Sequence, residues 1–164
     1  MRRRLNTIGV HGWSLDEFLA ALAEHDVAVL VDVRQRRGVR GPQYAWANSQ
    51  RLQAALADAG IAYVHRKDLA PTTELRELQY AADELRGEGK RSRSEISPEY
   101  HRRYLAEILD EANLEELVAE LPATRSSALL CVELRPEACH RSLIAERLRQ
   151  EHGFEPEHLR PDRV

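Results

Sequence analysis

The residues best suited to chemistry are gathered in the segment Cys139-His140-Arg141-Ser142, which stands at the start of a predicted helix. Free backbone N–H groups and the helix dipole favour an anion at such an end. Arg141 adds a guanidinium with the geometry to hold a phosphate or a carboxylate through two hydrogen bonds. Ser142 can cap the helix or donate a hydroxyl hydrogen bond. We therefore expect an anion to bind here, with Arg141 and Ser142 as ligands.

Cys139 permits a second interpretation of the same segment. A helix start lowers the pKa of a thiol and favours a thiolate nucleophile. The order of strand, turn and Cys-His-Arg-Ser is similar to the layout of cysteine phosphatases and sulfurtransferases. The usual Cys-x5-Arg spacing is absent, however, because Arg141 follows Cys139 by only two residues. Anion binding is thus favoured over a nucleophilic Cys139, and a buried structural cysteine with Arg141 in an ion pair is the alternative.

Acidic and basic side chains also follow the apolar runs that read as strands. Asp32 and Arg34 lie on one face at the end of such a run, because alternate residues of a strand share a face. The Asp32 carboxylate could act as a base, orient a hydroxyl, or pair with Arg34 or Arg141. Glu133 stands at the end of the apolar run 127–133, and the same alternative roles apply to its carboxylate. Our catalytic candidates are Asp32, Glu133, Cys139 and His140, and the ligand-binding candidates are Arg34, Tyr44, His65, Arg141 and Ser142.

Arginine is concentrated in two segments, although the net charge is −3. The first holds Arg34, Arg36, Arg37 and Arg40, and the second holds Lys90, Arg91, Arg93, Arg102 and Arg103. Such clusters indicate an anionic ligand or nucleic acid, or else solvated faces with compensating charges. The loop 34–46 is predicted to be a mobile cover over the site. Its Tyr44 or Trp46 could stack on a base, or both could pack into the core.

Metal and cofactor motifs are not recognised. Cys131, Cys139, His140, His65 and His11 could be ligands, but no pair has the Cys-x2-Cys or His-x3-His spacing of a zinc site. The chain also lacks a Walker loop, a G-x-G-x-x-G segment and a G-x-S-x-G segment. The sequence therefore predicts neither a metal nor a cofactor.

The elements that must position these residues alternate between strand and helix. Apolar runs predict strands over 5–10, 27–33, 61–65 and 127–133, with a short one near 158–159. Cap residues and periodicity predict helices after Ser14, Asn48, Thr72 or Thr73 and Ser97, over 114–121, and from near His140 to Gly153. This order predicts a single α/β domain over 1–164, with a mainly parallel sheet of about four or five strands and helices on both faces. Ligands of such sheets bind outside the carboxyl ends of the strands.

Composition limits the protein class. No apolar run approaches the roughly 18–20 residues that span a bilayer. Two cysteines are too few for a disulfide framework and fit a reducing compartment. We therefore expect a cytoplasmic protein without a membrane partner.

Several segments resemble one known family. They are Thr7-Ile8-Gly9, Gly12, Ser14-Leu15, Val31-Asp32-Val33-Arg34, Pro42-Gln43-Tyr44, Tyr63-Val64-His65, Leu130-Cys131-Val132-Glu133 and Pro136 to Ala145. In this order they resemble the family called domain of unknown function 488, from which the chain departs at His11 and Trp13. The resemblance implies a compact α/β fold and a cytoplasmic protein, and it supplies no reaction.

Three functions fit these observations. The first is an enzyme acting on a phosphate-bearing ligand, such as a nucleotide or a nucleic-acid component. The second is a non-catalytic nucleic-acid-binding or regulatory module that uses the two arginine segments. The third is a sulfurtransferase or phosphatase-like enzyme with Cys139 as its nucleophile. Four arginines within residues 34–40 favour the first two.

Overall fold

A five-stranded parallel sheet forms the centre of the molecule in the computed structural model, which describes residues 2–89 and 93–161. The strands are β1 (Arg3–Gly9), β2 (Val27–Asp32), β3 (Ala62–His65), β4 (Ser126–Cys131) and β5 (Phe154–His158). Their order is β3-β2-β4-β1-β5, and every pairing is parallel. The predicted α/β class and the parallel sheet are confirmed.

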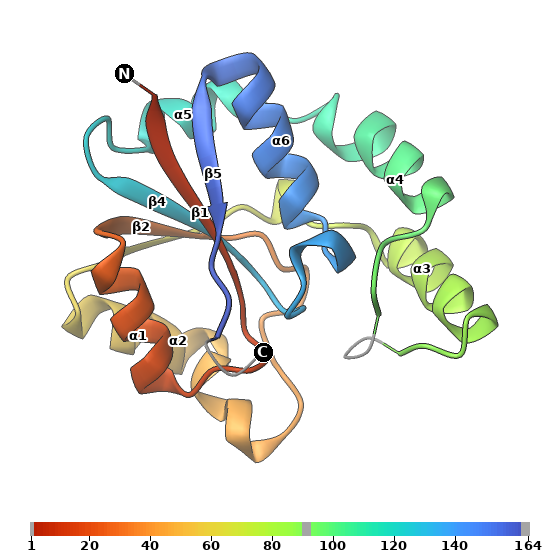
Figure 1. The fold of residues 1–164 in the computed structure, drawn as a ribbon, viewed down its shortest axis with the longest axis horizontal. Helices are drawn as coiled ribbons and strands as arrows, with labels where there is room; N and C mark the ends of the chain where they lie inside the picture. Colours follow the sequence, from red (N-terminus) through yellow and green to blue (C-terminus); the bar gives the residue numbers. More distant parts are fainter. Residues whose placement is uncertain (1, 90–92, 162–164) are drawn as a thin grey trace.

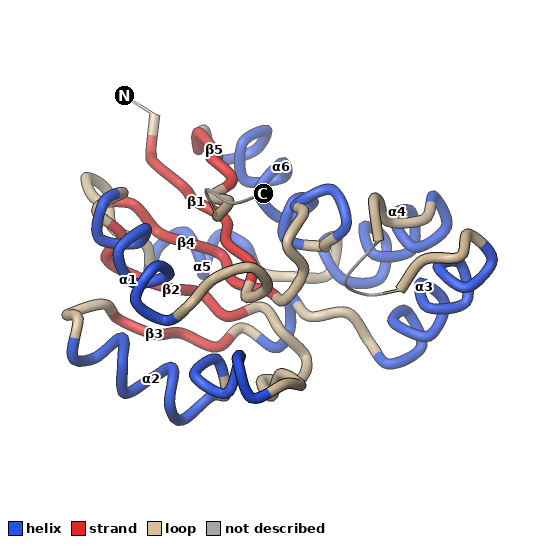
Figure 2. Tube along the Cα trace, turned by 60° about the horizontal axis from the view of Figure 1, so that its bottom comes forward, coloured by secondary structure: helices blue, strands red, loops and turns tan. Residues whose placement is uncertain are grey.

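The three central strands are mostly buried, and β2 is almost continuously apolar, because helices cover both faces of the sheet. Alternate residues of β4 belong to different cores: Leu129 packs on one side of the sheet and Leu130 on the other. Helices α1 (Leu15–Glu24) and α2 (Ser49–Asp58) cover one face, and α5 (Leu114–Glu120) and α6 (Arg141–His152) cover the other, as Figures 1 and 2 show. Near-continuous apolar strands of this kind are typical of buried parallel sheets.

Helices α3 (Thr73–Leu85) and α4 (Pro98–Tyr104) form an arm that extends past the ends of the strands (Figures 1 and 2). The Tyr104 hydroxyl donates to the Leu69 carbonyl oxygen at 2.6 Å and attaches α4 to the segment after β3. A π-helical turn, Leu105–Leu109, continues α4. The arm therefore places side chains above the carboxyl end of the sheet.

The helix starts follow the predicted caps with one exception. Ser14 and Glu17 form both hydrogen bonds of a capping box, and Thr72 and Ser97 each cap a helix through the side chain. Asn48 occupies the cap position of α2 but makes no cap bond, because its Oδ1 atom accepts from Val39 N at 2.9 Å. The predicted loop before it also contains a 3₁₀ helix, Pro42–Ala47.

The strand order creates a crevice between β2 and β4. The chain leaves β2 toward β3 over one face, and it leaves β4 toward β5 over the opposite face. Ligands of open α/β sheets bind at such a switch point, outside the carboxyl ends of the strands. Two short 3₁₀ turns, Lys67–Leu69 and Pro136–Ala138, follow β3 and β4 at this end.

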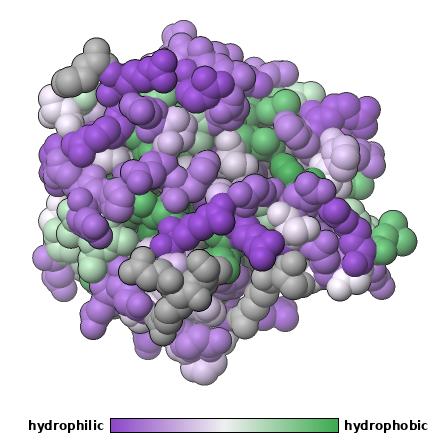
Figure 3. Space-filling view, in the orientation of Figure 1, coloured by the Kyte–Doolittle hydropathy of each residue, from purple (hydrophilic) through white to green (hydrophobic). Residues whose placement is uncertain are grey.

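The surface is mainly hydrophilic on the face seen in Figure 3. Within the described ranges, the exposed large apolar side chains are Tyr80 and Leu85, both on α3. None of the described helices has the length and apolar character needed to span a membrane.

Candidate functional site

A cavity opens at the predicted place, between the carboxyl ends of β2 and β4 and the arm. It holds about 520 Å³ of space, part of which is open to solvent. The segment after β2 contributes Arg34 and Arg36, α3 contributes Arg76 and Tyr80, and the end of β4 contributes Cys131 and Glu133. Cys139 and His140 also line it. A second cavity continues from the first, because Arg36, Arg76, Tyr80 and Val132 line both.

Asp32 and Arg34 form a buried ion pair at the root of the loop after β2. The Arg34 Nε and Nη2 atoms each lie 2.8 Å from an Asp32 carboxylate oxygen. The Tyr63 hydroxyl donates to Asp32 Oδ2 at 2.6 Å, and burial raises the pKa of Tyr63. His65 Nε2 lies 3.0 Å from the Arg34 carbonyl oxygen. Asp32, Arg34 and His65 thus come together as predicted, but their interactions hold the loop in place.

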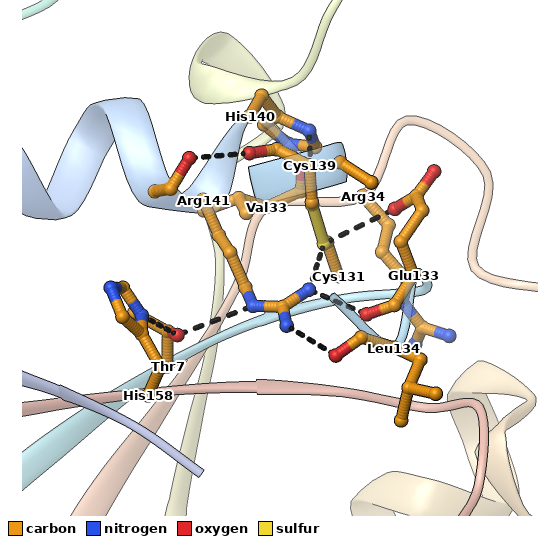
Figure 4. The surroundings of a disulfide bond; sticks show 12 residues. Thr7, Val33, Arg34, Cys131, Glu133, Leu134, Cys139, His140, Arg141 and His158 are labelled. Carbon is orange, nitrogen blue, oxygen red and sulfur yellow. Dashed lines mark hydrogen bonds between the residues drawn. A yellow bond between two sulfur atoms is a disulfide. The ribbon is translucent and has the colours of Figure 1, made fainter. Parts of the chain in front are cut away.

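Arg141 lies beneath the end of β4 and does not line the cavity. Its guanidinium donates to Thr7 Oγ1 at 3.2 Å and to the carbonyl oxygens of Glu133 and Leu134 at 2.6 and 3.2 Å, as the dashed lines of Figure 4 show. Within residues 2–89 and 93–161 no carboxylate lies within 4.0 Å of it. Burial lowers the pKa of Arg141 to about 10. The sequence predicts Arg141 as an anion ligand, but in the structure its guanidinium is fully buried and donates to the backbone that follows β4.

Polar groups at the start of α6 form hydrogen bonds with neighbouring residues of the same segment. Ser142 Oγ donates to the Cys139 carbonyl oxygen at 2.9 Å, and Ser142 N approaches the same oxygen at 3.3 Å. Leu143 N donates to the His140 carbonyl oxygen at 3.0 Å. These contacts leave Ser142 as a local cap and not as a ligand of the cavity.

Cys139 is joined to Cys131 by a disulfide bond, which the sequence did not predict. The turn that contains Pro136 folds the chain back, so that residues eight positions apart meet at the end of β4. Figure 4 shows the bond between Arg141 on one side and His140 on the other. Cys139 is therefore not a free thiol in this state.

His140 is buried next to this disulfide. Its Nε2 lies 2.9 Å from the Val33 carbonyl oxygen, and its Nδ1 lies 3.7 Å from Cys139 Sγ. Its ring packs against Tyr104, with the ring centroids 5.6 Å apart. Burial lowers the pKa of His140, which keeps the imidazole neutral at pH 7.

Glu133 is the acidic catalytic candidate that lines the cavity, whereas Asp32 does not line it. Its side chain is 13% exposed, and its Oε1 atom lies 3.4 Å from Arg93 Nη1. Arg93 is held more closely by Asp83, with Nη2 and Oδ2 at 2.7 Å, and it donates to the Ala138 carbonyl oxygen at 3.1 Å. Arg93 thus connects the arm to the segment after β4. This role could not be predicted, because Asp83 lies in α3 whereas Arg93 lies in the segment between α3 and α4.

Arg36 and Arg76 are the basic groups best placed for an anion. Arg36 is exposed, and Arg76 donates to Gln35 Oε1 at 2.7 Å and to the Tyr80 hydroxyl at 2.9 Å. In the part of the chain that the structure describes, neither guanidinium has a carboxylate within 4.0 Å. Sequence reasoning missed Arg76 and Tyr80. Their spacing of four residues on a predicted helix, which places side chains on one face, could have indicated them.

The aromatic side chains of the loop 34–46 pack against the protein. The Tyr44 hydroxyl accepts from Gly12 N at 3.0 Å, and the Tyr44 ring lies against His11. The Trp46 ring lies 4.9 Å from that of Phe18. The packing interpretation of these two aromatics therefore describes the structure better than base stacking.

The second arginine segment is largely compensated by acids. Arg103 pairs with Glu74 and Glu107, and Arg102 approaches Glu99 at 4.0 Å. Lys90 and Arg91 lie outside the described residues. This segment does not form a continuous basic surface over the described residues.

One comparison with known proteins gives a match. A family model described as "Domain of unknown function DUF488" matches residues 14–148, which include the cavity and both cysteines. No curated protein and no solved structure matches the chain significantly.

Proposed function

The chain belongs to the DUF488 family, whose description names no activity, and we propose from its geometry that it binds a small phosphate-bearing molecule such as a nucleotide. The proposed site is the cavity at the carboxyl ends of β2 and β4. The observation that carries the proposal is the pair Arg36 and Arg76. Both line the two joined cavities, and neither is neutralised by a carboxylate within 4.0 Å in the described ranges.

The joined cavities have the size and the aromatic surface for a nucleotide. The second of them, which Arg36, Arg76 and Tyr80 also line, has a volume of about 580 Å³, within the range typical of small-molecule sites. Tyr80 is 38% exposed beside Arg76, and a base could lie against the exposed part of its side chain. Arginine is suited to phosphate because its planar fork gives two parallel hydrogen bonds. We therefore place the phosphate between Arg36 and Arg76, and the base near Tyr80.

Glu133 supplies the chemistry in this proposal. It lines the same cavity and retains some exposure, whereas Asp32 is fully buried in its ion pair. A carboxylate in this position can act as a general base toward a bound substrate. We propose an enzyme that acts on the bound phosphate compound in the cytoplasm, with Glu133 as the acid–base group.

Isothermal titration with AMP, pyrophosphate and inorganic phosphate tests the binding proposal. A hydrogen bond to a charged group contributes roughly 1.5–3 kcal/mol, so Arg36→Gln or Arg76→Gln should weaken AMP binding by at least about 10-fold. Arg102→Gln is the matched control, because Arg102 is an exposed arginine on α4 outside the cavity. Unchanged affinity in the Arg36→Gln/Arg76→Gln double variant, or no binding of any of the three probes, would refute the proposal.

Nucleic-acid binding is the competing function, and salt dependence separates the two. A module that tracks several phosphates loses affinity steeply with salt, and a pocket for one phosphate group does so much less. We expect a shallow dependence for AMP and no tighter binding of short oligonucleotides. A steep salt slope with oligonucleotides that bind more tightly than AMP would favour the module instead.

A further inference from the structure

Three side chains that commonly bind metals meet at the floor of the cavity. They are Cys131 at the end of β4 and Cys139 and His140 before α6, and their ligand atoms all lie within 4.8 Å of one another. All three are buried and line the cavity. We propose that, when the two cysteines are reduced, these side chains bind a divalent transition-metal ion such as Zn²⁺. The fourth coordination position then faces the cavity, as in zinc sites that carry out chemistry.

The orientation of His140 suits a metal ligand. The Val33 carbonyl oxygen, 2.9 Å from Nε2, can only accept a hydrogen bond, so Nε2 carries the proton of the neutral ring. The lone pair is then on Nδ1, which lies 3.7 Å from Cys139 Sγ. Nitrogen and sulfur ligands of one tetrahedral zinc ion are separated by roughly 3.6 Å, as follows from the usual bond lengths. A backbone carbonyl on the other ring nitrogen is a common partner of a metal-bound histidine.

The backbone at the two cysteines is spaced more widely than in a usual disulfide. Their Cα atoms are 7.3 Å apart, which is wider than the roughly 4.4–6.8 Å usual for a disulfide. Reduction of the bond requires two electrons and two protons: two external thiols supply both and become a disulfide, whereas a phosphine supplies the electrons, water supplies the protons, and the phosphine becomes its oxide. Binding of the ion then displaces the two thiol protons to solvent, and the sulfur atoms move to about 3.8 Å apart on either side of it.

The buried charge of Arg141 favours this thiolate state. Arg141 is 0% exposed, and its Nη1 lies 3.1 Å from Cys131 Sγ. No carboxylate within the described ranges lies within 4.0 Å of its guanidinium, and a buried cation is costly without an anionic neighbour. A disulfide sulfur is neutral, whereas a metal-bound thiolate keeps negative charge and accepts N–H bonds. A thiolate at Cys131 would therefore give Arg141 an anionic partner in addition to the neutral oxygen atoms to which it already donates.

Titration of the full chain with Co²⁺ tests the inference without any substrate, and it does not depend on the phosphate proposal. The protein is first reduced with a phosphine under anaerobic conditions, and two free thiols are verified with a thiol reagent. We expect one Co²⁺ per chain, with a thiolate-to-metal charge-transfer band and the visible bands of tetrahedral Co²⁺. Zn²⁺ should displace the Co²⁺ and protect both thiols from alkylation. A folded protein with two free thiols that binds neither ion would overturn the proposal.

Matched variants identify the ligands. Cys139→Ser and His140→Asn should weaken Co²⁺ binding by more than the roughly 10–100-fold that outer-shell changes cost. His25→Gln, which changes an imidazole outside the ligand set, should keep one Co²⁺ and its charge-transfer band. Circular dichroism establishes that each variant is folded. Retention of the full Co²⁺ spectrum in Cys139→Ser, or its loss in His25→Gln, would show that the three-ligand assignment is wrong.

Discussion

At the scale of single residues, Gly9 and Arg141 depend on each other. Arg141 reaches the carbonyl oxygens that follow β4 only because Gly9, at the end of β1, has no side chain. A Cβ atom at this position would overlap the Glu133 carbonyl oxygen and lie 3.1 Å from Arg141 Nη1. The close approach of two backbone segments, and not an unusual backbone angle, therefore requires glycine here.

We expect Gly9→Ala to destabilise the protein by about 1–3 kcal/mol, the usual range for an overpacked interior. Urea denaturation followed by circular dichroism measures this change. Gly38→Ala is the matched control, since a Cβ there would meet only the Asn48 Oδ1 atom at 3.8 Å, and it should have little effect. Equal stability of Gly9→Ala and the wild type would show that the segment after β4 can move aside freely.

Arg141 and Arg36 show how far the role of a single arginine can be predicted from the sequence. The sequence analysis names Arg141 as a ligand-binding candidate and Arg36 only as a member of the first arginine segment, whereas in the structure Arg36 lines the cavity and Arg141 does not. The Arg141 guanidinium reaches the backbone because a residue distant in the sequence, Gly9, has no side chain. A contact between residues so far apart cannot be predicted from a local sequence pattern. For the same reason, the meeting of Cys131 with Cys139 depends on the turn at Pro136, and its spacing matches no known metal motif.

At the scale of elements, the 3₁₀ turn after β3 has an ion pair of its own. Arg66 Nε and Nη2 lie 2.9 and 2.8 Å from the two carboxylate oxygens of Asp68. These hydrogen bonds from Arg66 lower the pKa of Asp68 below its usual value. A lowered pKa in the folded state means that the carboxylate contributes stability above its unfolded pKa, and that this contribution is lost as the pH falls.

We therefore expect the melting temperature of the wild type to fall more steeply below about pH 4 than that of Asp68→Asn. The difference at neutral pH should stay below about 1 kcal/mol, because the pair is partly exposed and screened by solvent. Melting curves from pH 2 to pH 7, at about one-unit steps, measure both quantities, and Asp58→Asn on the exposed end of α2 is the control. If the melting temperatures of the wild type and Asp68→Asn change with pH in parallel, the ion pair between Arg66 and Asp68 does not stabilise the folded state.

Most elements could be predicted from the sequence because each is coded locally. Uninterrupted apolar runs indicate β2 and β4, and the cap residues Ser14, Thr72 and Ser97 mark helix starts. The strand order could not be predicted, because parallel neighbours are joined through crossovers and β4 enters between two earlier strands. The position of the arm could not be predicted either, because it depends on contacts between residues far apart in the sequence, such as that of Tyr104 with Leu69.

At the scale of the whole molecule, the structure consists of a sheet covered on both faces and an arm at its end. The central strands β1, β2 and β4 are paired on both sides and mostly buried, whereas α3 and α4 have large exposed faces. We expect the slowest amide hydrogen exchange in those three strands and faster exchange in α3 and α4, because exposed elements open without global unfolding. Mass spectrometry of peptic fragments measures this order. Slower exchange in the arm than in β4 would contradict it.

The outer strand β5 has the sequence Phe-Glu-Pro-Glu-His, and Pro156 pairs with Leu5 of β1 in its middle. Proline lacks the N–H that a neighbouring strand would need, and exposed charges such as those of Glu155 and Glu157 are costly to bury between sheets. A sheet that ends in this way does not accept a strand from another molecule at that edge. The protein should therefore resist edge-to-edge aggregation there even at high concentration, a protection that comes from a five-residue strand at the edge of the sheet.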